Sequence, residues 1–121
     1  FRRDVEMVYP ALDLHVLLSK REGFGISTVE AMSCAVAVVG TDVPGTRDIL
    51  AGTEAGVLVP PLNEKHTADT IIGLLQDDER RSAMGYAGRK LAMAKYSKER
   101  WTDSVGRFYR SIELGREETH R

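Results

Sequence analysis

The sequence predicts an α/β fold in which helices cover both faces of a parallel sheet. Three short apolar segments, residues 14–18, 35–40 and 56–59, alternate with segments of helical spacing. The apolar segments are continuous rather than alternating, which is typical of parallel strands buried on both faces. Glycine and proline residues separate them from the helices. This order predicts part of a doubly wound, Rossmann-like sheet.

Composition limits the classes of function. The chain has 121 residues, of which 42% are hydrophobic and 29% are charged, as expected for one soluble globular domain. Its 17 basic and 18 acidic residues give a formal net charge of −1, which excludes a general basic field for nucleic acid. Cys34 is the only cysteine. We therefore expect no internal disulfide and a cytoplasmic location.

No part of the sequence predicts a membrane span or a signal peptide. No apolar run approaches the roughly 20 residues that a transmembrane helix needs. The chain begins with Phe1 and enters a helical pattern at once. We therefore expect it to be a piece of a longer protein, with an unpaired strand edge and some uncovered apolar surface.

The first half of the chain predicts a helix, a strand and a second helix. Residues 4–12 have helical spacing, although Pro10 disturbs the end. Residues 14–18 predict a buried strand, and residues 19–24 a loop. Residues 25–35 again have helical spacing, and the strand of residues 35–40 follows.

The second half is mostly helical. A short helix over residues 46–50 follows a Pro-Gly turn, and the strand of residues 56–59 is stopped by two prolines. Helices are predicted over residues 64–76 and 78–96. Ser97 is a predicted N-cap for a last helix that ends near Leu114, with frayed residues beyond. Its apolar stripe consists of Trp101, Val105, Phe108, Tyr109 and Ile112.

The loop after residue 18 is the predicted functional site. In doubly wound sheets, ligands bind at the carboxyl ends of the strands, and this loop is such an end. A helix beginning near Gly25 offers the amides of Gly25, Ile26, Ser27 and Thr28 to an anion such as a phosphate. Gly23 and Gly25 let the backbone approach a ligand closely. Ser27 and Thr28 also offer hydroxyl groups.

Two glutamates flank this helix start. Glu30 lies about one turn into the helix, and its carboxylate is a poor neighbour for phosphate but suits two vicinal hydroxyls, such as those of a ribose. Glu22, before the glycines, suits a second sugar. A ligand made of ribose, diphosphate and hexose satisfies the whole arrangement. The alternative is that Glu22 is a solvated loop charge and Glu30 lies on an exposed helix face.

The remaining candidates have simpler explanations. His15 lies among apolar strand residues, which favours a structural or interface role over a catalytic base. No His, Cys or acidic residue has metal-ligand spacing, so we predict no metal site. Cys34 is expected to be a small buried side chain. Lys20 and Arg21 flank the motif, where the favoured interpretation is a pair of solvated loop charges and the alternative is contact with the phosphates of a ligand. Arg47, at another strand end, is a candidate ligand contact.

At these residues the sequence resembles the retaining nucleotide-sugar glycosyltransferases of the GT-B fold, of the family 4 type. Glu22 and Glu30 match the E-x7-E signature, with "GFGISTV" between them. "EAMSCAVAVVGTDVPGTRDIL" and "AGVLVPPLNEKHTADTIIGLL" also resemble family segments. Residues 1–121 resemble the last part of the carboxyl-terminal, donor-binding domain, with its C-terminal helices from about residue 64.

The resemblance implies a role for each site residue. Glu22 would contact hydroxyls of the transferred sugar at the reacting centre, and Glu30 would hold the ribose. Amides from Gly23 to Ser27, including those of Phe24, Gly25 and Ile26, would bind the sugar and the diphosphate. The donor would be a nucleotide-sugar such as a UDP- or GDP-sugar, with no cofactor and no Asp-x-Asp metal. The helix end would stabilise the leaving diphosphate.

The resemblance also implies that essential parts lie before Phe1. An Arg/Lys pair and the domain that binds the acceptor glycan, lipid or small molecule would precede the chain. The chain alone should therefore not catalyse transfer, and the whole protein is expected in the cytoplasm or peripherally at a membrane. The final helix would brace the first domain, so its aromatic stripe is expected to be partly exposed here.

Three residues depart from the family pattern, which has Pro, Gly and Pro where this chain has Leu18, Ala35 and Ala37. These positions affect local geometry more than chemistry. Two other functions stay open at this point. One is a non-catalytic nucleotide-sugar-binding module or an inactive truncated remnant, and the other is a structural α/β fragment without a ligand site.

Overall fold

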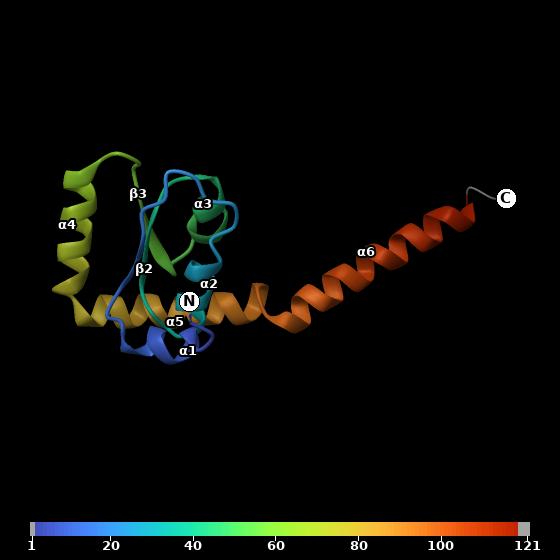
Figure 1. The fold of residues 1–121 in the computed structure, drawn as a ribbon, viewed down its shortest axis with the longest axis horizontal. Coiled ribbons are helices and arrows are strands. Elements are labelled where there is room, and N and C mark those ends of the chain that lie inside the picture. Colours follow the sequence, from blue (N-terminus) through green and yellow to red (C-terminus); the bar gives the residue numbers. More distant parts are fainter. Residues whose placement is uncertain (1, 119–121) are drawn as a thin grey trace.

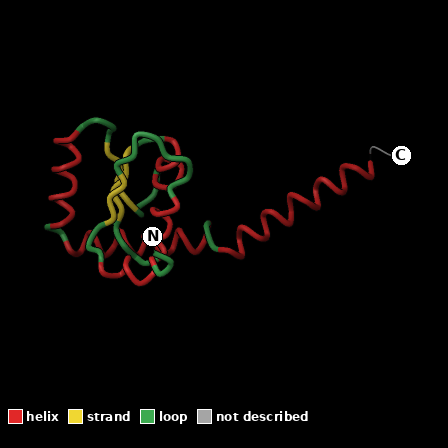
Figure 2. The backbone as a smooth tube through the Cα atoms, in the orientation of Figure 1, coloured by secondary structure: helices red, strands yellow, loops and turns green. Residues whose placement is uncertain are grey.

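The computed structural model describes residues 2–118, with the side chains of residues 108, 109 and 111–118 left undescribed. Three parallel strands, β1 (His15–Leu17), β2 (Val38–Thr41) and β3 (Gly56–Val59), form a sheet in the order β1-β2-β3. Val39 lies in register with Val16 on one side and Val57 on the other. The predicted α/β class is confirmed (Figure 2).

Helices lie on both faces of this sheet. Their bounds are α1 (Val5–Val8), the 3-10 helix η1 (Tyr9–Ala11), α2 (Ile26–Ser33), α3 (Pro44–Leu50), α4 (Glu64–Leu75), α5 (Asp78–Lys95) and α6 (Lys98–Glu118). Figure 1 shows α4 on one side of the strands and α2 and α3 on the other, while α5 crosses below them and α6 projects outward.

The sheet separates two hydrophobic clusters. The cluster toward α2 and α3 contains Met32, Val38, Ile49 and Leu50, and Ala92 from α5 closes it. The cluster toward α4 contains Ala37, Val39, Val59, Leu74 and Met84. Every residue of β2 is buried, which explains the continuous apolar character of its sequence.

Several element boundaries differ from the predictions. The helix predicted over residues 4–12 becomes 3-10 from Tyr9, because Pro10 cannot donate the hydrogen bond that an α-helix requires. The helix predicted from residue 46 begins at Pro44, since proline fits the first helical turn.

The strand predicted from Ala35 begins only at Val38. Ala35 has a φ of 59°, in the left-handed region that ends a helix and redirects the chain. The family pattern has glycine at this position, and Ala35 adopts a left-handed φ that glycine takes up more readily. A Cβ atom added to Gly85 of α5 would collide with the carbonyl of Ala35, so the two backbones are in close contact there.

The last helix extends further than predicted, to Glu118 rather than near Leu114. Ser97 caps its start, since its hydroxyl oxygen accepts the Arg100 amide at 3.4 Å. Trp101 is 69% exposed, as expected, whereas Phe108 and Tyr109 lie among the undescribed side chains. None of the helices within residues 2–118 is both long and apolar enough to cross a membrane.

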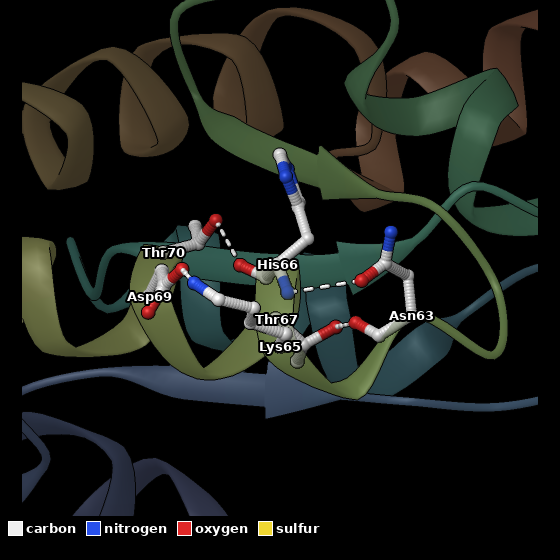
Figure 3. A network of polar contacts seen from close by, with 6 residues as sticks. All are labelled: Asn63, Lys65, His66, Thr67, Asp69 and Thr70. Carbon is white, nitrogen blue, oxygen red and sulfur yellow. Dashed lines mark hydrogen bonds and ion pairs between the residues drawn. The ribbon is translucent and has the colours of Figure 1, made fainter.

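The outer edge of β1 has no strand partner among the described residues. Leu12, Val16 and Leu18 are exposed around this edge. Beside the carboxyl ends of the strands, Asn63 caps α4 by accepting the His66 amide at 3.0 Å (Figure 3). Lys65 and Asp69 add an ion pair of 2.7 Å on the same helix.

Candidate functional site

The predicted site loop runs from the end of β1 to the start of α2. Gly25 is the N-cap of α2, and its φ of 83° lies in the left-handed region that glycine adopts most readily. The amide of Thr28 donates to the Gly25 carbonyl oxygen at 3.0 Å. The expectation that the Thr28 amide is free was therefore wrong. The amides of Ile26 and Ser27 precede this first hydrogen bond of the helix.

Thr28 also fails as a hydroxyl donor for a ligand. Its side chain is 0% exposed, and no group in the described part of the chain pairs with its hydroxyl oxygen. The residue therefore packs beneath the helix start. Ser27, by contrast, is partly exposed.

Glu22 is held between its own loop and α3. The Ser19 hydroxyl donates to Glu22 Oε2 at 3.1 Å, and the glutamate is half-buried. A Cβ atom at Gly25 would lie 3.6 Å from Glu22 Cγ, so the acidic side chain lies beside the cap of α2. A Cβ atom at Gly45 would lie only 2.7 Å from the carbonyl oxygens of Glu22 and Gly23. Gly45 thus lets α3 pack directly against the loop.

Glu30 is held by a residue that the sequence did not single out. The Tyr9 hydroxyl donates to Glu30 Oε2 at 3.1 Å, across 21 positions of the chain. Burial and this hydrogen bond raise the pKa of Tyr9 to about 12. No local pattern marks Tyr9 as functional, because the contact depends on how η1 packs against α2.

His15 completes this cluster. Its ring meets that of Tyr9 edge to face, with the centroids 5.8 Å apart. Nε2 of His15 is buried without a described hydrogen-bond partner. Burial lowers the pKa of His15, although the charge of Glu30 partly opposes this change. A half-buried histidine of β1, packed against an aromatic ring, fits the predicted structural role.

Part of the motif lines a cavity of about 510 Å³ between α2 and the junction of α5 and α6. Phe24, Ile26 and Glu30 contribute to its wall, and Phe24 meets the ring of Tyr96 edge to face at 5.6 Å. The lining also includes Val29, Ser33, Lys95, Tyr96, Lys98, Arg100, Trp101 and Ser104. Glu22, Gly23, Gly25 and Ser27 do not line this cavity. The two glutamates therefore have different surroundings.

The basic candidates are distributed around the site. The guanidinium of Arg47 bonds to Asp42, with Nε donating to Oδ1 at 2.6 Å and Nη2 to the Asp42 carbonyl oxygen at 3.2 Å. Its charge is thus paired within its own turn. Lys20 lines a second cavity, of about 340 Å³, beside the carboxyl ends of the strands. Arg21 is exposed.

Two further predictions can be compared with the structure. Cys34 is partly exposed rather than buried, because it lies at the C-cap of α2 where the chain leaves the core. Residues 2–118 contain no group of three or more His, Cys, Asp or Glu side chains that could hold a metal ion.

Comparison with known proteins adds independent information. The sequence model of the family described as "Glycosyl transferases group 1" matches residues 2–91. Over 100 residues the chain is 31% identical to N-acetyl-alpha-D-glucosaminyl L-malate synthase of Bacillus anthracis, covering 83% of this chain and 26% of that protein.

Solved structures share the fold. Sucrose-phosphate synthase from Thermosynechococcus elongatus has a TM-score of 0.83 and 30% identity, covering 89% of this chain and 27% of its own. HepE of Anabaena, solved in complex with UDP, has a TM-score of 0.86, and the match covers 92% of this chain and 31% of HepE. At 23% identity, this likeness shows the fold alone.

These neighbours are GT-B glycosyltransferases. The chain spans about a quarter of the first two relatives, 26% and 27% of their lengths. The family match covers most of the chain, from the short helix before β1 through most of α5. The chain therefore belongs to the group 1 glycosyl transferase family.

Proposed function

We propose that this chain binds the nucleotide-sugar donor in a retaining glycosyltransferase of the family 4 type. The observation that carries the proposal is the pair of glutamates, Glu22 and Glu30, placed on either side of the glycine-capped start of α2. This start lies at the carboxyl end of β1, where doubly wound sheets bind ligands.

The diphosphate of the donor binds at the start of α2. The amides of Ile26 and Ser27 carry the partial positive charge of the helix end, and the exposed Gly23 has no side chain to obstruct the approach. The same amides stabilise the negative charge that develops on the diphosphate as the bond to the sugar breaks. This stabilisation needs no metal ion held by the chain.

The two glutamates bind the two sugars of the donor. The Glu30 carboxylate accepts hydrogen bonds from the vicinal hydroxyls of the ribose. Glu22, beside the cap of α2, accepts hydroxyls of the transferred sugar and lies nearest the reacting carbon. Retention requires the acceptor oxygen to bond to that carbon on the face from which the diphosphate leaves.

The acceptor binds to parts of the protein outside these residues. The 121-residue chain therefore binds donor without turning it over, and the longer protein transfers the sugar to a glycan, lipid or small molecule. We place the reaction in the cytoplasm, free or peripherally at a membrane, because a single free cysteine suits a reducing compartment.

The proposal is tested by measuring the affinity of the chain and of its Glu30→Ala variant for UDP, GDP and ADP by calorimetric titration. The substitution removes two hydrogen bonds to a charged group, so affinity for the preferred nucleotide falls at least about tenfold. Glu79→Ala, at an exposed position of α5, is the matched control and leaves affinity unchanged. Equal affinity of the Glu30→Ala and control variants would contradict the ribose role. Nucleotide binding without turnover in the longer protein would instead favour a non-catalytic binding module.

A further inference from the structure

Tyr9 and Glu30 come from separate elements and meet through one hydrogen bond. Tyr9 opens η1, and Glu30 lies in the middle of α2. The 3.1 Å distance from the Tyr9 hydroxyl to Glu30 Oε2 fits a hydrogen bond to a carboxylate. Both side chains are half-buried. The contact therefore fixes one carboxylate oxygen of a glutamate that also lines the cavity between α2 and the junction of α5 and α6.

A carboxylate bound on one side retains capacity for a diol. An ionised glutamate has about four acceptor positions on its two oxygens, and the Tyr9 hydroxyl uses one of them. Oε1 and the remaining position on Oε2 stay available. A free glutamate side chain rotates about three bonds, and holding it in one orientation costs conformational entropy. Because the Tyr9 hydroxyl already holds the carboxylate by a hydrogen bond, less of this entropy is lost when a ligand binds.

Tyr9 is itself held in position. The His15 ring packs edge to face against it, and Tyr9 also packs against the cluster around Met32. Such edge contacts between rings are favourable in energy. The hydroxyl is therefore presented to Glu30 by a ring whose position is set by β1 and α2.

We propose that Tyr9 is a positioning residue, which orients the Glu30 carboxylate so that it accepts the two vicinal hydroxyls of a ribose. This inference rests on the proposed function, since it requires Glu30 to bind the ribose. It adds a residue outside the glycine-rich loop to the site. It also explains how the carboxylate of a single helix glutamate is held in one orientation for a diol.

The test is Tyr9→Phe in the 121-residue chain, which keeps the ring and removes only the hydroxyl. UDP and 2′,3′-dideoxy-UDP are the probes, and their dissociation constants are measured by calorimetry. Loss of one hydrogen bond to the carboxylate weakens UDP binding by about three- to tenfold. Binding of the dideoxy nucleotide, which has no diol, stays the same. A merely structural role would weaken both nucleotides equally.

The controls separate this inference from the proposed function. Tyr86→Phe, at an exposed position of α5, leaves both affinities unchanged. If Glu30→Ala removes the preference for UDP over the dideoxy nucleotide while Tyr9→Phe retains it, the positioning role is wrong and the ribose site stands. If the unsubstituted chain binds neither probe, the same pair of measurements is made with GDP and ADP and their dideoxy forms. Binding of no nucleotide, or equal binding of the preferred nucleotide and its dideoxy form, means that the ribose site itself is wrong and the positioning role falls with it.

Discussion

Gly45 packs its α-carbon against the backbone of Glu22. A Cβ atom at position 45 would lie 2.7 Å from the Glu22 carbonyl oxygen, closer than real Cβ contacts allow. Gly45 lies in the first turn of α3, and Glu22 lies in the loop after β1. The start of α3 therefore determines how far the site loop extends over the carboxyl end of the sheet.

Gly45→Ala should displace this loop. The new methyl group forces backbone atoms apart, which we expect to cost about 1–3 kcal/mol in the free energy of unfolding. Displacement of Glu22 should also weaken binding of a nucleotide-sugar by about tenfold or more. Urea denaturation and calorimetric titration measure the two effects.

Gly73→Ala is the matched control for this prediction. Gly73 lies in α4, and a Cβ atom there meets no atom within 4 Å. Alanine should therefore stabilise the chain by about 0.5–1 kcal/mol, because glycine is a poor helix residue. A Gly45→Ala variant as stable as this control, with unchanged affinity, would show that the loop does not depend on the contact.

Replacing Leu62 with glycine should stabilise the chain. The φ of 59° at Leu62 lies in the left-handed region, and 87% of the residue is exposed, so its side chain contributes little packing. The left-handed conformation costs a non-glycine residue roughly 1–2 kcal/mol, part of which glycine loses again through its freer unfolded state. Leu62→Gly should raise the free energy of unfolding by up to about 1 kcal/mol. Leu62→Ala keeps the unfavourable φ and should change little, and a gain from alanine as large as that from glycine would contradict the backbone explanation.

His15 should make stability depend on pH. Burial lowers its pKa in the folded chain, so the unfolded chain takes up the proton more readily. Its contribution is fully present above the ordinary pKa of about 6.5 and is lost as the pH falls through that value toward the folded pKa. The loss is at most about 1.4 kcal/mol per pH unit for one proton.

Urea denaturation at pH 7.5 and at pH 5.5 measures the dependence. His15→Phe keeps an aromatic ring beside Tyr9 and should reduce the difference between the two pH values. His66→Ala, at an exposed position of α4, should leave the difference unchanged. If His15→Phe keeps the full difference, the titrating group is another residue.

Removing the cap of α4 should destabilise the chain. The Asn63 side chain accepts the His66 amide at 3.0 Å, which satisfies one free amide at the helix start. Asn63→Ala should therefore lower the free energy of unfolding by about 0.5–2 kcal/mol. Asn63→Asp should retain most of the stability that the cap contributes, because aspartate is also a good N-cap. Thermal unfolding monitored by circular dichroism compares the two variants. Equal losses in both would argue against capping as the cause.

Much of the fold could be predicted because its signals are local. The segment around Val38 and Val39 is continuously apolar, since β2 is buried on both faces, and the prolines after Val59 mark the end of β3. The early start predicted for β2 failed at Ala35. Its left-handed φ ends α2, where the Val36 amide donates to the Ala31 carbonyl oxygen at 3.0 Å, and alanine gives no local sign of this conformation.

The local part of the site could be predicted, whereas its contacts between distant segments could not. The glycine-rich loop and its two glutamates lie within nine consecutive residues, so their spacing is visible in the sequence. The Tyr9 hydrogen bond to Glu30 and the contact of Gly45 with Glu22 join distant segments. Both depend on helix packing, which spacing along the chain does not reveal. The ion pair of Arg47 with Asp42, by contrast, is local and spans five positions of the chain.

The most direct test of donor binding is an amide NMR titration of the 121-residue chain with UDP, GDP and ADP, alone and as sugar conjugates. We predict a dispersed spectrum in which one nucleotide shifts the amides of residues 23–30, with the largest changes at Ile26 and Ser27. A dispersed spectrum that no nucleotide changes would contradict the claim that this chain binds the donor through the start of α2.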